Sequence, residues 1–554
     1  MTGPRAYPAQ PADLQRDRMP DRYAWVVWLP AAIAVMCYLP ALWNGFALDD
    51  VIIIADDNAL HHLSTLIGAL GRPYWYDVGH LYRPLTTLAF GLEWWVGHGS
   101  PLLFHAVNLI WHAGVTAMVA RLALRWWPAP AALGAGLWFA IHPVHAEAVA
   151  NVVGRSELVC AAALLGLALL ATAPALAARE RVPGDPPMDR LTPWLGFALA
   201  VCAMASKETG VVAPAVVWAA AVTPVPGDRR ASAIRRAQAL RLTGAAAAGV
   251  GCLLAARWLI LGTLAGDSPH YAFELARGWR GTLVALAAVP RALSLMVAPQ
   301  PPGLDYSPPD GAILHPNPAL VLLGITLVLA ALVVAWRHVR EPAAWTFVAC
   351  FGMVTYAPVS NLFVRSGVVV ADRTLYSPSV AVAIAAGAVL MSAWAARRWL
   401  AIGVAGVVAS TALWFTEGSL GSWKDSPAAF AAIRERSPSS YLGHFTMAEL
   451  RDRANDPLGA QREYAIAAGL TPHNAAVLYM AAANAIRLRD TTRALGLLTR
   501  AVALRPDGAR TRTALVGLEL RRGDTASARV QLRDGLAIDS TQRAWREELR
   551  KIGG

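Results

Sequence analysis

Apolar runs of about 20 residues recur along the first 420 residues, and they constrain the fold more than any other feature. A helix of that length crosses the roughly 30 Å hydrocarbon layer of a bilayer, where backbone polar groups must be satisfied within the helix. With 56% hydrophobic residues over 554, the chain is too apolar for an ordinary soluble protein. We expect an all-α, polytopic membrane helical bundle with about 11 spans, at 24–43, 102–124, 131–150, 156–178, 191–206, 209–225, 242–264, 318–336, 343–361, 374–396 and 399–416.

Arginine residues cluster in a few connections between these runs and predict the orientation of the bundle, because cytoplasmic connections carry an excess of Lys and Arg. The clusters are Arg121 and Arg125; Arg179, Arg181 and Arg190; Arg229, Arg230, Arg235, Arg236 and Arg241; Arg337 and Arg340; and Arg397 and Arg398. The outward connections are then 44–101, 151–155, 207–208, 265–317, 362–373 and everything after 416. The net charge of +12 faces anionic lipid head groups, and no nucleic acid partner is implied.

Two further segments bear on the orientation. Residues 1–23 are polar, and the apolar run after them lacks a small-residue cleavage site, so we expect a cytoplasmic tail and an uncleaved first span. The apolar run 281–299 carries Arg291 at its centre and would invert everything after it if it spanned, so we expect a re-entrant or interfacial helix there. High Ala, Arg and Pro usage fits a GC-rich bacterial genome, and therefore an inner (cytoplasmic) membrane.

An acidic pair, Asp49 and Asp50, lies directly after the first span. Carboxylates just outside the bilayer can take a proton from an acceptor hydroxyl at the level of a lipid head group. Exposed aspartates are also common in solvated loops, which is the alternative for the pair alone. The predicted orientation places more polar residues on the same side: Arg83, the stretch 142–147, Arg155, Glu157, Lys207, Glu208, Asp305, Tyr306, Asp372, Arg373 and Tyr376.

Histidines near these residues leave two interpretations open. His105, Asn108 and His112 share one helical face, which indicates either hydrogen bonds between helices or a face toward substrate. His142, His145 and Glu147 could suggest a metal, but their spacing is not a strong ligand pattern, and we predict no metal. The five cysteines fall in apolar runs without CxxC spacing.

After residue 420 the composition changes to charged helical sequence with an internal repeat. Pro438, Pro472 and Pro506 are 34 residues apart. Small residues recur in register with them (Ala460, Ala494 and Ala528, then Ala467, Ala501 and Gly535), with Tyr464, Leu498 and Leu532 between. This period and order are typical of tetratricopeptide repeats. We expect an α-solenoid of about three repeats over 421–554, which binds peptides or proteins.

Short motifs follow one another along the chain at Asp49-Asp50, 82–85, 104–108, 142–149, 154–158, 206–209, 304–307 and 372–379. In this order they resemble the motifs of the transmembrane and tetratricopeptide-repeat-containing (TMTC) family, which is similar to protein O-mannosyltransferases of the GT-C fold. Asp372 stands where the family pattern has Glu, and Ser377 where Leu is usual. The resemblance implies a GT-C-like transmembrane domain over 24–420 and an extracytoplasmic, in bacteria periplasmic, repeat domain.

The resemblance also implies a polyprenyl-phosphate sugar as donor, with mannose the first candidate, and transfer to Ser or Thr of extracytoplasmic proteins. We expect Asp49 or Asp50 to be the general base of an inverting displacement, Asp49 first. Arg373, Arg83, Arg155 and Lys207 are candidates for the donor phosphate. The remaining pocket candidates are His105, Asn108, His142, His145, Glu147, Glu157, Glu208, Asp305, Tyr306, Asp372 and Tyr376.

Two alternatives belong to other functional classes. One is a membrane scaffold without catalysis, whose repeats hold a partner protein. The other is a transporter of lipid-linked sugar that uses the same polar residues without chemistry. An enzyme requires Asp49 or Asp50, Arg83 and Arg373 around one site, because a general base must lie within hydrogen-bond reach of the proton it removes.

Overall fold

The computed structural model describes residues 23–75, 81–173, 191–226, 232–264 and 270–553. These ranges form helices and turns without a strand, so the expected all-α class is confirmed for them. The expected tail 1–23, apart from Tyr23, lies outside the described residues, as do Asp77, Arg179, Arg181, Arg190, Arg229 and Arg230.

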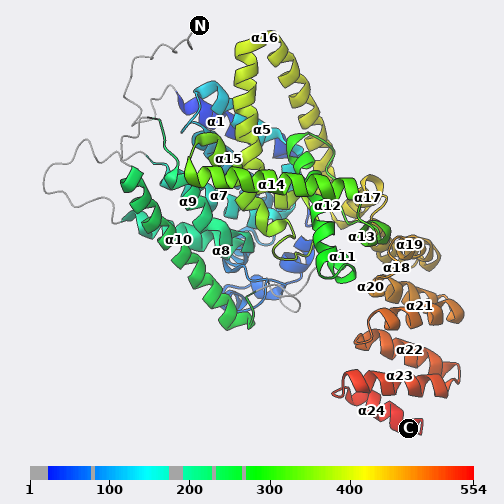
Figure 1. Ribbon diagram of the computed structural model, residues 1–554. Coiled ribbons are helices and arrows are strands. Elements are labelled where there is room, and N and C mark those ends of the chain that lie inside the picture. The colour runs from blue at the N-terminus through cyan, green and yellow to red at the C-terminus, as the bar shows by residue number, and fades with distance from the viewer. Residues whose placement is uncertain (1–22, 76–80, 174–190, 227–231, 265–269, 554) are drawn as a thin grey trace.

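Sixteen α-helices of the described ranges form the first part of the chain (Figure 1). They are α1 (Ala24–Tyr38), α2 (Leu63–Ala69), α3 (Pro84–Gly97), α4 (Pro101–Ala123), α5 (Ala129–Ile141), α6 (Ala146–Ala150), α7 (Arg155–Ala171), α8 (Leu191–Ser206), α9 (Ala213–Val222), α10 (Ser232–Leu261), α11 (Tyr271–Leu275), α12 (Trp279–Val297), α13 (Asp310–Leu314), α14 (Pro318–Arg340), α15 (Ala344–Tyr356) and α16 (Tyr376–Leu420).

Seven helical segments of the described ranges are long and apolar enough to cross a membrane, which supports a multi-pass membrane protein. They are Ala24–Trp43, Pro101–Ala123, Val152–Ala171, Arg235–Leu261, Trp279–Val297, Pro318–Arg340 and Asp372–Trp423. The other expected runs coincide with shorter apolar helices: Ala129–Ile141, Leu191–Ser206, Glu208–Val222 and Ala344–Val359. The number of about 11 spans therefore stays a prediction.

Two expected segments differ from the structure. The run 131–150 is not one helix: α5 ends at Ile141, because the residue before Pro143 is pushed out of the α conformation and His142 is extended (ψ 128°). Short turns and α6 then carry the chain to Asn151, so the connection with the polar motif is longer than predicted. The run 281–299 forms α12, a continuous helix of 19 residues that is also long and apolar enough to span, so the re-entrant form is not seen and the interfacial placement stays a prediction.

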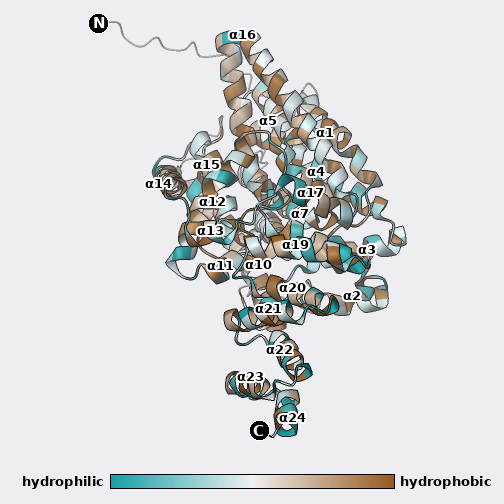
Figure 2. Ribbon diagram, turned by 90° about the vertical axis from the view of Figure 1, so that its right-hand side faces the viewer, coloured by the Kyte–Doolittle hydropathy of each residue, from teal (hydrophilic) through white to brown (hydrophobic). Residues whose placement is uncertain are grey.

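The longest helix, α16, contains both of the last two expected spans. Its backbone breaks at Arg397 (φ −150°, ψ 83°), and Figure 1 shows two arms that meet at one end. The first arm packs closely on α5, where a Cβ on Gly387 would lie 2.2 Å from the carbonyl oxygen of Ala131. Figures 1 and 2 show α14 lengthwise and end-on, so it lies across the direction of α16. Only 6% of the most apolar window of α14 is buried by other parts of the protein, so we expect lipid to cover the rest of this helix.

The last part of the chain is a helical solenoid that hangs from one side of the bundle (Figures 1 and 2). After α17 (Ser426–Arg436), its helix pairs are α18 (Tyr441–Arg453) with α19 (Pro457–Leu470), α20 (Ala475–Arg487) with α21 (Thr491–Leu504), and α22 (Ala509–Arg521) with α23 (Thr525–Ile538), followed by α24 (Arg543–Lys551). The repeat positions Ala460, Ala494 and Ala528 are fully buried, as the 34-residue period predicts.

The solenoid contacts the segment between α10 and α14. Asp310, at the start of α13, accepts hydrogen bonds from the backbone N–H of His473 (2.9 Å) and from Tyr271 (2.7 Å), and it contacts Nδ1 of His473 (2.8 Å). Arg505 and Glu274 approach to 3.9 Å beside them. The repeats are therefore held against the predicted outward loop 265–317.

Candidate active site

The acidic pair after α1 divides between two environments. Leu48 has a left-handed backbone (φ 51°), and the turn directs the two aspartates differently. The Asp50 side chain is buried, and its oxygens accept N–H groups of Val153 (2.8 Å), Val152 (3.2 Å) and Ala47 (3.3 Å). Asp50 therefore fastens this loop to the loop before α7. The Asp49 side chain keeps 29% of its surface exposed.

Arg373 is the partner of Asp49. Its Nη1 lies 3.2 Å from Oδ2 of Asp49, and its Nε lies 3.5 Å from Oε1 of Glu147. The backbone N–H of Arg373 also donates to Oε2 of Glu147, at 2.9 Å. Arg373 belongs to a 3₁₀ turn (Asp372–Leu375) before α16, and Glu147 lies on α6. Three segments far apart in the sequence thus meet at one guanidinium.

A second group of charges continues from this contact. Arg83, at the start of α3, donates to Glu208 through Nε (3.0 Å) and Nη2 (2.9 Å), and Arg257 of α10 lies 3.8 Å from Glu208. Lys207 pairs with Glu157. Lys207 and Glu208, although adjacent in the chain, therefore each have a partner on another element.

The two groups lie around one place. Arg83 stacks over the ring of Tyr74 at 4.9 Å, and burial raises the pKa of Tyr74, with the charges of Arg83, Asp49, Asp50 and Arg373 also acting on it. Burial lowers the pKa of Lys207 well below its usual range, and Arg83 and Arg373 lower it further. Burial raises the pKa of Glu147, which Arg373 opposes. The structure thus brings together the charges that an enzyme was expected to need.

Arg155 does not face this site, although we expected it among the phosphate ligands. Its side chain is fully buried and donates to Glu93, to Oδ1 of Asn108 and, at 2.8 Å, to the carbonyl oxygen of Phe104. Asn108 in turn donates to the carbonyl oxygens of Val149 (3.0 Å) and Asn151 (3.1 Å). Both residues hold the loop between α6 and α7, which is a structural role.

The expected histidines of the pocket are also interior residues. His145 contacts the carbonyl oxygen of Phe139 and Oγ of Ser379, each at 2.8 Å, and its ring packs against Tyr376. Burial lowers the pKa of His142 to about 3, so His142 is neutral. Tyr376 is fully buried and contacts Nδ1 of His112 at 2.8 Å. His105 is buried beside the carbonyl oxygen of Gly45 (3.2 Å). These contacts favour the interhelical interpretation of the histidine face.

Asp305, Tyr306 and Asp372 lie beside the site. The hydroxyl of Tyr306 donates to Asp372 at 2.9 Å, and Asp372 is buried directly before Arg373 in the chain. Asp305 accepts from Ser307 (2.7 Å) and Ser440. Within the described ranges, no cluster of three or more His, Cys, Asp and Glu is arranged to hold a metal ion.

Sequence reasoning did not place four residues of this region in the site: Tyr74, Glu93, Arg257 and Arg291. Glu93, Arg257 and Arg291 carry a usable signal, because a charge within an otherwise apolar helix needs a partner. Tyr74 carries less, because its stacking on Arg83 depends on the tertiary arrangement.

Comparisons with known proteins agree with the motifs. No protein-family model matches the chain. Human protein O-mannosyl-transferase TMTC3 is 34% identical over 138 residues, which are 24% of this chain and 15% of that protein. Human protein O-mannosyl-transferase TMTC4 is 27% identical over 410 residues, which cover 64% of this chain and 54% of that protein. The chain thus spans about half the length, or less, of these two relatives.

Among solved structures, the archaeal oligosaccharyltransferase AglB from Archaeoglobus fulgidus, in complex with an inhibitory peptide and a dolichol-phosphate, matches with a TM-score of 0.39 and 13% identity. The match covers 76% of this chain and 58% of AglB. The names of the curated relatives confirm the resemblance found in the motifs: these relatives are protein O-mannosyltransferases of the TMTC family.

Proposed function

We propose that this protein is a membrane glycosyltransferase that transfers a sugar, mannose first, from a polyprenyl-phosphate donor to Ser or Thr hydroxyls of extracytoplasmic proteins. The names of its relatives support the reaction class. The observation that carries the proposal is the contact of a partly exposed carboxylate, Asp49, with Arg373, beside a second cationic group around Arg83. A scaffold would have no need for this arrangement.

In the proposed step, Asp49 accepts the proton of the acceptor hydroxyl while the hydroxyl oxygen attacks the anomeric carbon. The bond between that carbon and the phosphate oxygen breaks on the opposite face, so the configuration inverts, and polyprenyl phosphate leaves with the electron pair. General-base help of this kind contributes about 10² to 10⁴ in rate. Asp49 suits the role better than Asp50, because Asp50 is buried and its oxygens already accept three backbone N–H groups.

The leaving phosphate gains negative charge, and a preorganised cation stabilises that charge. Arg373 and Arg83 are the best candidates, because their side chains keep 27% and 14% of their surfaces exposed. Lys207 pairs inward with Glu157, and its role is to position the segment that carries Glu208. The carboxylate of Glu147 orients Arg373, because it contacts both the backbone N–H and the guanidinium of Arg373.

The proposal includes a location and a partner. The protein lies in a bacterial inner membrane with the N-terminus in the cytoplasm and the repeats in the periplasm. The solenoid binds the acceptor protein, since stacked helix pairs form extended binding surfaces. Its contact with the loop 265–317 would bring that acceptor toward the site.

The test is transfer of labelled mannose from polyprenyl-phosphate mannose to periplasmic proteins by purified wild type, Asp49→Asn and Asp56→Asn. Asp56 is an exposed residue of the same loop, so its amide variant is a matched control. We expect Asp49→Asn to lose about 10² or more in kcat while Asp56→Asn keeps wild-type activity. Absence of transfer by the wild type with several lipid-linked sugars and acceptors would refute the enzyme and favour the scaffold or the transporter.

A further inference from the structure

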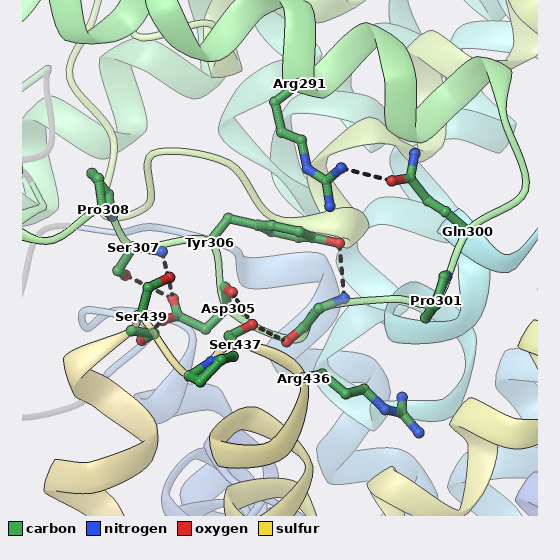
Figure 3. A pocket seen from close by; sticks show the side chains of 13 residues that line it. Arg291, Gln300, Pro301, Asp305, Tyr306, Ser307, Pro308, Arg436, Ser437 and Ser439 are labelled. Carbon is green, nitrogen blue, oxygen red and sulfur yellow. Dashed lines mark hydrogen bonds between the residues drawn. The ribbon is translucent and has the colours of Figure 1, made fainter. Parts of the chain in front are cut away.

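A cavity of about 530 Å³ lies next to the site described above and not at Asp49 itself. One wall comes from α12 and the loop after it, and the other from the linker between α17 and α18, which we call the repeat linker (436–440). In Figure 3, Arg291 reaches from α12 onto the ring of Tyr306, and Ser437, Ser439 and Arg436 lie on the other wall. Its size is within the range of ligand pockets, about 300 to 1,000 Å³.

Hydrogen bonds join the two walls. Ser437 Oγ donates to the carbonyl oxygens of Gly303 (2.9 Å) and Asp305 (2.7 Å), and Ser440 donates to the carboxylate of Asp305. The membrane part and the solenoid therefore build the cavity together. A polypeptide that the repeats hold would pass this junction on its way to the membrane part.

The cavity is also connected to the candidate active site. The hydroxyl of Tyr306, which lines the cavity, donates to Asp372 at 2.9 Å. Asp372 precedes Arg373, whose guanidinium contacts Asp49. Tyr306 and Asp372 thus connect the cavity to the residue pair proposed for catalysis.

The charges that line the cavity favour an anionic guest. Two arginines, Arg291 and Arg436, face one carboxylate, Asp305, and both oxygens of Asp305 already accept hydrogen bonds. Arg291 donates one hydrogen bond to Gln300 (2.6 Å) and stacks over Tyr306 (5.2 Å). Arg436 donates one to the carbonyl oxygen of Gly418 (2.9 Å). A guanidinium has five N–H donors, so both keep donors for a ligand.

We propose that this cavity binds an extended segment of the acceptor polypeptide in which an acidic side chain stands near the Ser or Thr to be modified. The inference rests on the proposed function. The lining favours a peptide over a lipid tail. Four serines, two arginines, Gln300 and Asp305 line the cavity beside three prolines and a tyrosine, and among the described residues no Leu, Ile, Val or Phe side chain does, whereas a lipid tail requires aliphatic walls. The acidic side chain pairs with Arg291, and the hydroxyl is presented past Tyr306 toward Asp49.

The test measures binding and transfer separately, with the full-length protein in detergent. The probes are a fluorescent peptide with one Thr between two Asp and the same peptide with Asn in place of Asp. For Arg291→Gln we expect an increase in the Kd of the acidic peptide of about tenfold, with no change for the Asn peptide. Arg280→Gln is the control, because Arg280 is exposed on the same helix and stacks only on Trp279 among the interactions described.

Arg291→Gln also removes the stacking of Arg291 on Tyr306, so a second pair of variants tests the charge of the cavity without changing that contact. Ser439 is exposed at the cavity, and we expect Ser439→Glu to weaken and Ser439→Lys to strengthen binding of the acidic peptide, by about two- to fivefold each. With transfer as the readout, Arg291→Gln should raise KM for the acidic peptide and leave kcat unchanged.

Three outcomes separate the inference from the proposed function. If the wild type binds the acidic peptide but transfers no sugar, the proposed peptide site would stand and the proposed glycosyltransferase function would be refuted. Transfer in which Arg291→Gln and the Ser439 variants treat both peptides alike would overturn the inference alone. A higher KM of Arg291→Gln for the lipid donor, with peptide binding intact, would assign the cavity to a lipid phosphate and also overturn it.

Discussion

The two aspartates after α1 differ in how the fold uses them. Asp49 shares its charge with Arg373 and keeps contact with solvent, whereas Asp50 lies among backbone N–H groups in the interior. Burial raises the pKa of Asp50 from 3.8 to about 7, while the N–H groups of Val153, Ala47 and Val152 oppose the rise. The same residue type thus supplies one carboxylate that suits the proposed chemistry and one that holds the loop in place.

This difference predicts a pH-dependent stability. Because the pKa of Asp50 is higher in the folded than in the unfolded protein, the folded state binds this proton more tightly. The resulting contribution to the free energy of unfolding is complete below about pH 4 and is lost as the pH rises to about 7. Asp50→Asn places an amide NH₂ against N–H donors, so we expect it to lower the melting temperature in detergent. The deficit should narrow between pH 5 and pH 8, because only the wild type loses the proton-linked stability.

Asp56→Asn is the control for this measurement and should follow the wild type at every pH. A deficit of Asp50→Asn that is constant between pH 5 and pH 8 would contradict the raised pKa of the folded state.

Arg155 leads to a second prediction at the residue scale. Its guanidinium donates hydrogen bonds to Glu93, to Asn108 and to the carbonyl oxygen of Phe104 at the same time. A lysine ammonium group lacks this planar, forked arrangement of donors and cannot reach all three acceptors at once. We expect Arg155→Lys to destabilise the protein by about 1 to 3 kcal/mol, as measured by thermal unfolding in detergent, because the ammonium group leaves at least one of these acceptors without its hydrogen bond.

The double variant Arg155→Met with Glu93→Gln removes both charges of this pair. It should be more stable than Arg155→Met alone, and equal stability of the two would show that Glu93 is not the partner that matters.

At the scale of elements, close helix packing explains why small residues mark the contact of α5 and α16. Gly134 and Gly387 face each other: a Cβ on Gly134 would lie 3.3 Å from the Cα of Gly387. This contact positions the 3₁₀ turn with Arg373, since the turn continues directly into α16. The broken backbone at Arg397 lets the second arm of α16 return toward the solenoid.

We expect Gly387→Ala to destabilise the protein by about 1 to 3 kcal/mol, because the added methyl group would overlap the backbone of α5. Gly406 lies on the second arm of the same helix, and a Cβ there meets nothing within 4 Å. Melting temperatures in detergent should therefore fall for Gly387→Ala and hold or rise for Gly406→Ala. Equal effects would argue against the close contact of α5 and α16.

For the whole molecule, the important arrangement is the docking of the solenoid on the loop 265–317. Asp310 is buried at this junction and accepts hydrogen bonds from both Tyr271 and His473. The cavity proposed for the acceptor exists because the two parts meet there. The proposed binding of the acceptor thus depends on the contact between the solenoid and this loop.

Asp310→Ala should loosen this docking. We expect amide hydrogen exchange in 300–308 and 436–440 to speed up by about tenfold or more, because hydrogen bonds to a charged group are each worth about 1.5 to 3 kcal/mol. Exchange within α22 and α23 should not change. Asp524→Asn, which alters only the cap of α23, is the control and should leave the junction unaffected.

The sequence by itself determined the helical class, the apolar runs and the 34-residue repeat, because these depend on residue type and spacing along the chain. It also identified Asp49, Arg83 and Arg373 as candidates, and the structure brings them to one place. Only the tertiary structure decided that Asp50, Arg155 and the histidines are interior residues and that Lys207 pairs with Glu157. It alone revealed the cavity beside Tyr306. Burial and partners are set by segments that lie tens to hundreds of residues apart in the sequence, and no local pattern encodes which polar group another segment will cover.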